Sequence, residues 1–339
     1  MVPGFKTAAA FVGVVIGAGF ASGQELMQFF VVLGPRAALS VLMAGFLFAL
    51  AGSAVVWLSL RWRLSHYGDL ILKLLGPTWS LPVELIVSLF LLSGFAIMLA
   101  GSGAIGDNYL SFAPGACALV TAAITLFIVV ARAEGILNFN TWAVPLILII
   151  LLAASFRNLE VQLQGGMGAS HESRWLLNSL LYVSYNMIPA TVLLVSLPHQ
   201  VGSIFGAFIG GLVIGFAALF LVLALARLPA GSTTTEVPVL HLLACFGRPG
   251  QAVFTLVLWL AVVSTATADL YALTLRWYKN LGLTYNQTAI LITLLSFPLS
   301  SMGFSRLVKY VYPSFGYLIL FFLAIAFLKR LAKLVRGIK

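Results

Sequence analysis

The chain has 339 residues, of which 61% are hydrophobic and 8% are charged, and its mean hydropathy is +1.08. This composition excludes a soluble domain and predicts an all-α protein that crosses a membrane several times. The net charge of +10 does not indicate a nucleic-acid partner, because the Lys and Arg residues lie between apolar segments and at the C-terminus, where they set topology.

Ten apolar segments can each hold the roughly 20 residues that a spanning helix needs. They cover about residues 5–33, 37–60, 82–107, 114–131, 139–156, 175–197, 202–226, 251–275, 287–303 and 311–331. If both termini are cytoplasmic, twelve of the nineteen Lys and Arg residues lie inside and seven outside. The positive-inside rule therefore predicts a multi-pass protein of the cell membrane with both termini in the cytoplasm, built as one membrane domain over residues 1–339.

The first segment contains four glycines and a carboxylate between Val12 and Glu25. Unpaired backbone groups at membrane depth cost several kcal/mol each unless they face protein, water or a ligand. We therefore expect a helix that is interrupted near Gly17 to Gly23, whose opened carbonyls and amides bind a substrate or an ion. The alternative is that these glycines only let a second helix pack closely.

The sixth segment has a similar feature, because Tyr185, Asn186 and Pro189 bring two polar groups and a proline to its middle. Proline removes a backbone donor, so this helix is also predicted to break. Breaks five spans apart predict two inverted repeats of five helices, about 5–156 and 175–331, with a binding site between them. The alternative is a plain proline kink in a packed helix.

The eighth segment offers the hydroxyls of Ser264 and Thr265 and the carbonyl of Ala261. If they face carbonyls freed at Gly13 and Ile16, five hard oxygens converge and suit a sodium ion. The alternative is that both hydroxyls bond the preceding turn of their own helix.

Two carboxylates in apolar segments, Glu25 and Asp269, are candidates for coupling or gating. Asp269 lies one turn beyond Thr265. It can attract the ion or pair with Lys6 as an inner gate, or it can pair with Arg276 or Lys279 at the end of its own helix.

The stretch from Gly17 to Glu25 resembles the YkvI family of bacterial membrane proteins. The broken first and sixth helices and the Ser-Thr string of the eighth resemble the LeuT fold of the amino acid–polyamine–organocation superfamily, over the whole ten-helix core. The resemblance implies one sodium ion, held by Gly13, Ile16, Ala261, Ser264 and Thr265. Phe20 stands where a second sodium site has asparagine, and residues 141–156 lack the lysine of proton-coupled relatives.

The resemblance also implies a substrate site made by the two broken helices and the third helix. Its candidate residues are Gly17, Ala18, Gly19, Phe20, Ser22, Gly23, Gln24, Phe90, Ser93, Gly94, Tyr185, Asn186 and Pro189. A half-helix N-terminus at Ser22 to Gln24 favours a carboxylate, so small amino acids or similar zwitterions are expected. A purely cationic amine is less favoured, unless Glu25 turns inward to supply the counter-charge.

The leading hypothesis is a sodium-coupled symporter of a small organic solute that works by alternating access. The alternatives are proton coupling through Glu25 or Asp269, and an amino acid sensor similar to spore germinant receptor subunits. No metal-ligand cluster or nucleophile motif indicates an enzyme. We expect no cofactor besides the coupling ion, no partner besides substrate and lipid, and a monomer.

Overall fold

The computed structural model describes residues 3–64, 66–107, 113–131, 139–159, 174–197, 199, 201–228 and 235–337. These residues form helices and no strand. By length and hydropathy, six helical stretches among them are able to cross a membrane, and shorter apolar helices lie at Gly4–Val15, Pro114–Val130 and Val144–Asn158. The multi-pass helical architecture predicted from the sequence is confirmed.

The first apolar segment is interrupted, as predicted. It consists of α1 (Pro3–Val15), α2 (Ala18–Ser22), α3 (Gln24–Phe29) and the 3-10 helix η1 (Val31–Arg36). The chain leaves the helix at Gly17, whose φ and ψ are −94° and −166°, and turns again at Gly23, whose φ is +81°. A side chain is rarely tolerated at such a φ, so glycine at position 23 lets the helix restart in a new direction.

The remaining helices follow the predicted segments closely. They are α4 (Ala37–Trp62), α5 (Tyr67–Leu75), α6 (Pro77–Ile105), α7 (Pro114–Val130), α8 (Phe139–Leu159), α9 (Trp175–Ser196), α10 (Ile204–Leu225), α11 (Val239–Leu242), η6 (Leu243–Phe246), α12 (Gly247–Asn280), α13 (Tyr285–Ser300) and α14 (Phe304–Gly337).

The predicted break in the sixth segment is wrong, because α9 is one continuous helix with Pro189 inside it. Proline removes the amide that would bond the carbonyl of Tyr185. This local loss does not open the helix, because α9 packs against α1, α4 and α14 along its length. Neighbouring helices make a proline tolerable at membrane depth.

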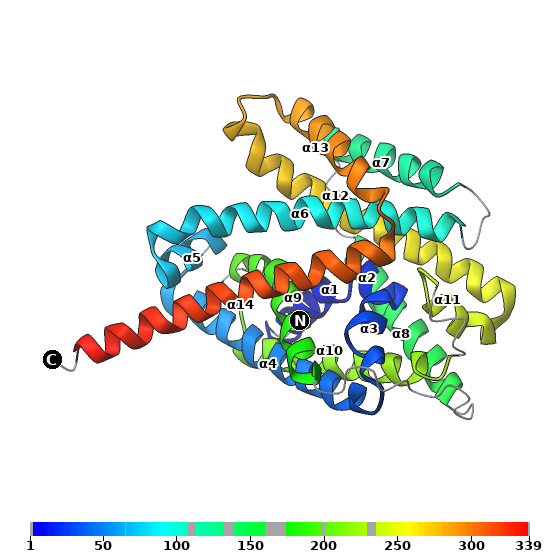
Figure 1. Cartoon of the computed structure of the whole chain (residues 1–339), viewed down its shortest axis with the longest axis horizontal. Helices are drawn as coiled ribbons and strands as arrows, with labels where there is room; N and C mark the ends of the chain where they lie inside the picture. The colour runs from blue at the N-terminus through cyan, green and yellow to red at the C-terminus, as the bar shows by residue number, and fades with distance from the viewer. Residues whose placement is uncertain are drawn as a thin grey trace.

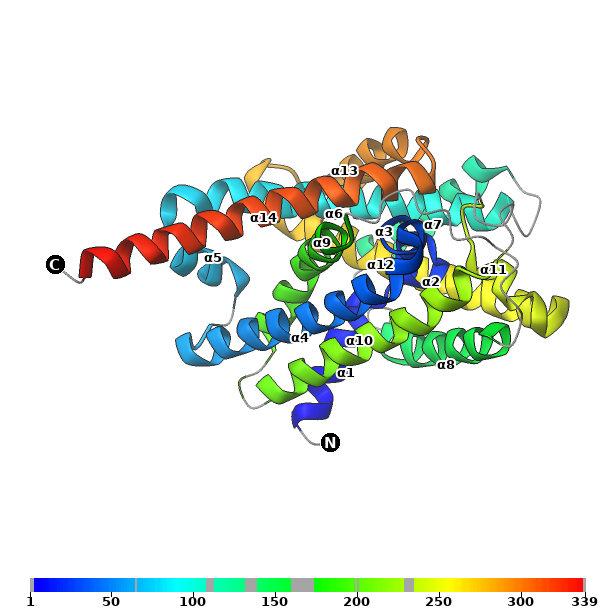
Figure 2. The same cartoon turned by 60° about the horizontal axis from the view of Figure 1, so that its bottom comes forward.

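The interrupted segment lies at the centre of the helix packing. There, α2 contacts α6 and α12, whereas α3 contacts α9 and α14. Figures 1 and 2 show α14 running past α9, and α4 lying beside α10. The α4–α10 pair is close because a Cβ on Gly45 would lie only 2.7 Å from the Cα of Gly215. The break therefore faces two different groups of helices.

Candidate functional site

The first part of the site is the place where the broken helix meets α12. The hydroxyl oxygen of Thr265 lies 3.9 Å from the position that a Cβ on Gly17 would occupy. The amide of Ile16 donates to Val12 and that of Ala21 donates to Gly17, but among the described residues no backbone amide donates to the carbonyls of Gly13 or Ile16. The break therefore leaves the carbonyls of Gly13 and Ile16 without helical donors, and the adjoining Gly17 lies near the Thr265 hydroxyl.

The other two predicted sodium ligands come from the same part of α12. Ala261 is 3% exposed and Ser264 is 1% exposed, so both are buried against the neighbouring helices. The structure thus brings the broken helix and the Ser-Thr string into one region. Coordination of sodium by these five residues stays a prediction.

The second part of the site is the carboxylate of Glu25, which is only 5% exposed. The hydroxyl of Tyr185 on α9 donates a hydrogen bond to Glu25 Oε2 at 2.8 Å. Glu25 Oε1 occupies the place that a Cβ on Gly19 would need. Glu25 therefore turns inward over α2, and only glycine at position 19 leaves room for it.

Aromatic rings surround this carboxylate. Tyr185 stacks on Tyr312 of α14 with ring centroids 4.5 Å apart and an interplanar angle of 15°. Phe29 and Tyr182 lie 5.5 Å and 5.6 Å from the Tyr185 ring, and Phe90 stacks on Tyr312 at 6.3 Å. Sequence reasoning found Phe90 and Tyr185 but missed the other three. A signal was available for Tyr182, because a tyrosine in the middle of an apolar span lies away from the interface that it normally prefers.

Asp269 lies against α6, which is the third predicted span, rather than against a cation. Its Oδ2 is 2.6 Å from the position that a Cβ on Gly94 would take. Lys6 is exposed, and the Arg276 guanidinium lies over the Tyr67 ring at 4.8 Å. No described basic group forms an ion pair with Asp269, so the predicted pairs with Lys6 and Arg276 are wrong for this structure. The side chain of Lys279 lies outside the described residues.

Several predicted substrate residues use their polar groups in hydrogen bonds to nearby residues of the same chain segment. The side-chain nitrogen of Asn186 donates to the Tyr182 carbonyl of its own helix at 3.0 Å. The Ser22 hydroxyl donates to the Gly19 carbonyl at 2.7 Å and accepts from the Gln24 amide at 3.2 Å. The backbone amide of Gln24 was expected to attract a substrate carboxylate, but it already donates to the Ser22 hydroxyl.

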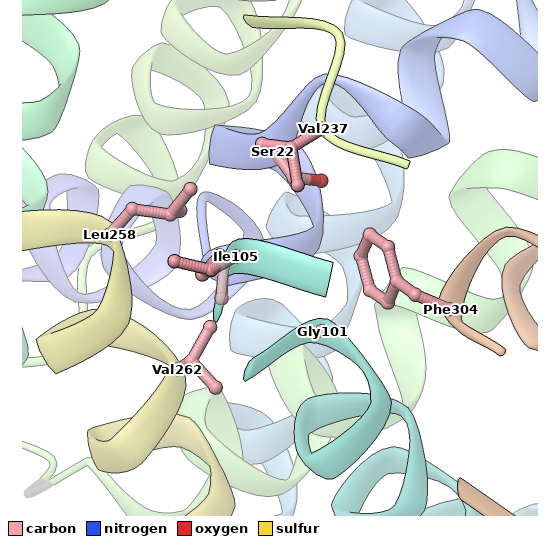
Figure 3. A pocket seen from close by; sticks show the side chains of 8 residues that line it. Ser22, Gly101, Ile105, Val237, Leu258, Val262 and Phe304 are labelled. Carbon is pink, nitrogen blue, oxygen red and sulfur yellow. The ribbon is translucent and has the colours of Figure 1, made fainter. Parts of the chain in front are cut away.

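A narrow apolar cavity lies above the break, between α2, α6, α12 and α14 (Figure 3). It has room for about one water molecule, and its walls are Ala18, Ser22, Gly101, Ile105, Val237, Leu258, Val262 and Phe304. It is too small for an organic substrate.

Residues 236–239, at the start of α11, lie between the Gly23 turn and the start of α14. Val239 lies 2.8 Å from where a Cβ on Gly23 would be, and Glu236 Oε1 accepts a hydrogen bond from the Ser305 amide at 3.4 Å. Burial, followed by the nearby Asp107, raises the pKa of Glu236 above its usual value, although the backbone amides of Phe304 and Ser305 oppose that shift. Residues 236–239, called the lid segment below, are thus joined to the start of α14 by this hydrogen bond.

Two curated relatives match nearly the whole chain. The chain is 28% identical over 334 residues to the uncharacterized membrane protein YkvI of Bacillus subtilis (strain 168), covering 96% of this chain and 95% of YkvI. It is 27% identical over 329 residues to YyaD of the same organism, covering 94% and 95%. No family model matches the chain.

Solved structures agree with this resemblance. The inward-facing conformation of Mhp1 matches with a TM-score of 0.63 and 16% identity, covering 93% of this chain and 73% of Mhp1. MhsT in complex with L-phenylalanine matches at 0.58 and 18%, covering 92% and 87%. An Eremococcus coleocola manganese transporter matches at 0.61 and 10%, covering 94% and 76%.

The chain is similar to YkvI over nearly its whole length and has the LeuT fold of Mhp1 and MhsT. At these identities the structural likeness concerns the fold, so substrate and coupling ion have to be argued from the residues of this chain.

Proposed function

We propose that the protein is a sodium-coupled secondary transporter that moves a small organic solute, an amino acid or similar zwitterion, by alternating access. The observation that supports it best is the break at Gly17, which lies near the Thr265 hydroxyl and before which the carbonyls of Gly13 and Ile16 have no helical donors. MhsT was solved with L-phenylalanine, which is a member of the proposed substrate class.

The proposed ion ties the broken helix to α12. Sodium is a hard cation that suits neutral carbonyl and hydroxyl oxygens. Binding it between α1 and α12 stabilises one arrangement of these helices over another, and its release allows them to separate. Each charge that crosses the membrane adds about 2.3 kcal/mol per 100 mV of potential, which drives uphill uptake.

The test is the thermal stability of the purified full-length chain in sodium and in potassium, because a ligand that binds the folded state raises its stability. We expect a sodium-specific increase in Tm that is lost when Ser264→Ala and Thr265→Ala are combined. Thr267→Ala is the matched control, because the Thr267 hydroxyl bonds the Val263 carbonyl of its own helix at 2.7 Å. Equal Tm values in both salts would exclude the sodium site.

Proton coupling is the second candidate, and the two buried carboxylates favour it. No described basic group offsets the charge of Glu25 or of Asp269. If protons replace sodium, ligand binding follows pH in either salt, and Glu25→Gln or Asp269→Asn abolishes that dependence. An amino acid sensor would instead bind its ligand and give no flux in proteoliposomes.

A further inference from the structure

We propose that the substrate carries an ammonium group and that Glu25, framed by Tyr185 and Tyr312, binds it. The inference rests on the proposed transport function, because it names the chemistry that the same broken-helix site selects. It also revises the expectation that a carboxylate is the main recognised group, since the structure shows Glu25 turned inward.

The first argument is charge. Glu25 is 5% exposed, and its only described polar partner is the neutral hydroxyl of Tyr185. An ionised carboxylate away from water is costly unless an opposite charge or several hydrogen bonds compensate it. No described side chain supplies that opposite charge. A bound ammonium group would supply this positive charge. The charge would leave the site again when the substrate is released.

The second argument is the balance of donors and acceptors. Gln24 Oε1 and the Tyr182 hydroxyl are buried and have no hydrogen-bond partner among the described residues. The Tyr182 ring packs 5.6 Å from Tyr185, and its side chain is within electrostatic reach of Glu25. An ammonium has three donors and no acceptor, so it suits the Glu25 carboxylate and the nearby unpaired Tyr182 hydroxyl, which can accept a hydrogen bond. A substrate carboxylate would add acceptors there.

The third argument is the aromatic surround. Tyr185 and Tyr312 stack at 4.5 Å, and the Phe29 ring lies 5.5 Å from Tyr185. Ring faces that such a stack leaves uncovered carry negative potential and attract ammonium groups. Tyr312 is in electrostatic range of both Glu25 and Asp269, so the rings lie in the field of two carboxylates. The same surroundings repel an anion.

The ammonium group can belong to a simple amine or to an amino acid. Both sources satisfy the same contacts with Glu25, and they differ only in the need for a second subsite that binds a carboxylate. Matched probes separate them. Methylamine and 3-methylbutylamine carry only the ammonium, leucine carries both groups, and 4-methylpentanoate and 3-methylbutanol keep the carbon skeleton without the amino group.

The experiment measures the Tm of the purified full-length chain against each probe. Every probe with an amino group that raises the Tm should lose affinity by about tenfold or more in Glu25→Gln, as expected for a charge-assisted hydrogen bond. Glu84→Gln, an exposed glutamate on α6, is the matched control and should bind like the original chain. If Glu25→Gln does not fold, Tyr185→Phe and Glu25→Asp test the same contact.

The inference is overturned if no amino compound binds, if the amine-free analogues bind equally well, or if Glu25→Gln leaves amine binding unchanged. Measurement of solute flux in proteoliposomes shows whether the ammonium inference or the proposed transport function is wrong. Transport of a solute without an amino group would sink the inference and keep the transporter. Amine binding without any flux would support the ammonium inference and contradict the proposed transport function.

Discussion

The Tyr185 hydroxyl donates a 2.8 Å hydrogen bond to Glu25 Oε2 and so joins α9 to the restarted half of the first helix. On the other side of the break, the hydroxyl of Thr265 approaches Gly17. The two halves of one interrupted helix thus contact two different groups of helices. A ligand at Glu25 and an ion at Thr265 act on the same short segment, which is how their binding can be coupled.

Gly19→Ala should displace the Glu25 carboxylate, because the new Cβ would occupy the position of Oε1. We expect affinity for the bound solute to fall by about tenfold or more, since a misplaced charge loses its charge-assisted hydrogen bonds. Equilibrium binding or Tm shifts measure this. Gly115→Ala is the control, because nothing lies within 4 Å of a Cβ at that position. Unchanged affinity in Gly19→Ala would show that Glu25 does not bind the solute.

Tyr185→Phe should keep the ring stack on Tyr312 and remove the single described donor to Glu25. The buried carboxylate is then left unsatisfied, and we expect a loss of about 1–3 kcal/mol of stability. Reversible unfolding in detergent measures it. If the ligand supplies an ammonium, saturating ligand should recover part of the loss. Stability equal to that of the original chain would mean that the hydrogen bond contributes nothing.

Gly211→Ala should weaken the contact between α4 and α10. The added Cβ would collide with the backbone of Phe48 and Ala49, which cannot move aside as a flexible side chain does. We expect a destabilisation of about 1–3 kcal/mol, despite the higher helix propensity of alanine. The same unfolding assay measures it against Gly115→Ala. A more stable variant would contradict the close packing of these two helices.

The lid segment should be sensitive to pH through Glu236. Because its pKa in the folded protein is raised above 4.5, the folded state holds this proton more tightly than the unfolded state does. The stability that the folded protein gains from the protonated Glu236 side chain is fully present below pH 4.5. It is lost as the pH rises through the raised pKa. We therefore expect the Tm difference between the original chain and Glu236→Gln to shrink or reverse as the pH rises in that window.

Asp107 is the other described acid that acts on Glu236. In Asp107→Asn the pH dependence should therefore move to lower pH, because one like charge is removed. The Tm is compared across pH for the original chain, Glu236→Gln and Asp107→Asn. The same pH dependence of the Tm in all three would mean that Glu236 does not control the stability of the lid segment.

The sequence predicted the helical membrane architecture and the break in the first helix, because long apolar runs and clustered glycines are local features. It failed at Pro189, where the packing of α9 against three other helices keeps the helix continuous. That outcome depends on tertiary contacts, which a proline alone does not reveal.

The site was only partly predictable for the same reason. Glu25 and Thr265 stand out as polar groups in apolar segments, but the position of Tyr312 beside Tyr185 depends on how α14 crosses α9. Asp269 was expected to meet a cation and instead lies against Gly94, because α12 packs along α6. Which carboxylate faces which helix is set by this packing and not by sequence spacing.

The most direct test of the account is solute uptake into proteoliposomes under an imposed inward sodium gradient, with potassium as the comparison, using the solute that stabilises the purified chain. The account predicts accumulation driven by sodium, lost in the combined Ser264→Ala and Thr265→Ala variant and kept in Thr267→Ala. Accumulation that is equal in potassium, or stabilising binding with no uptake in either salt, would contradict it.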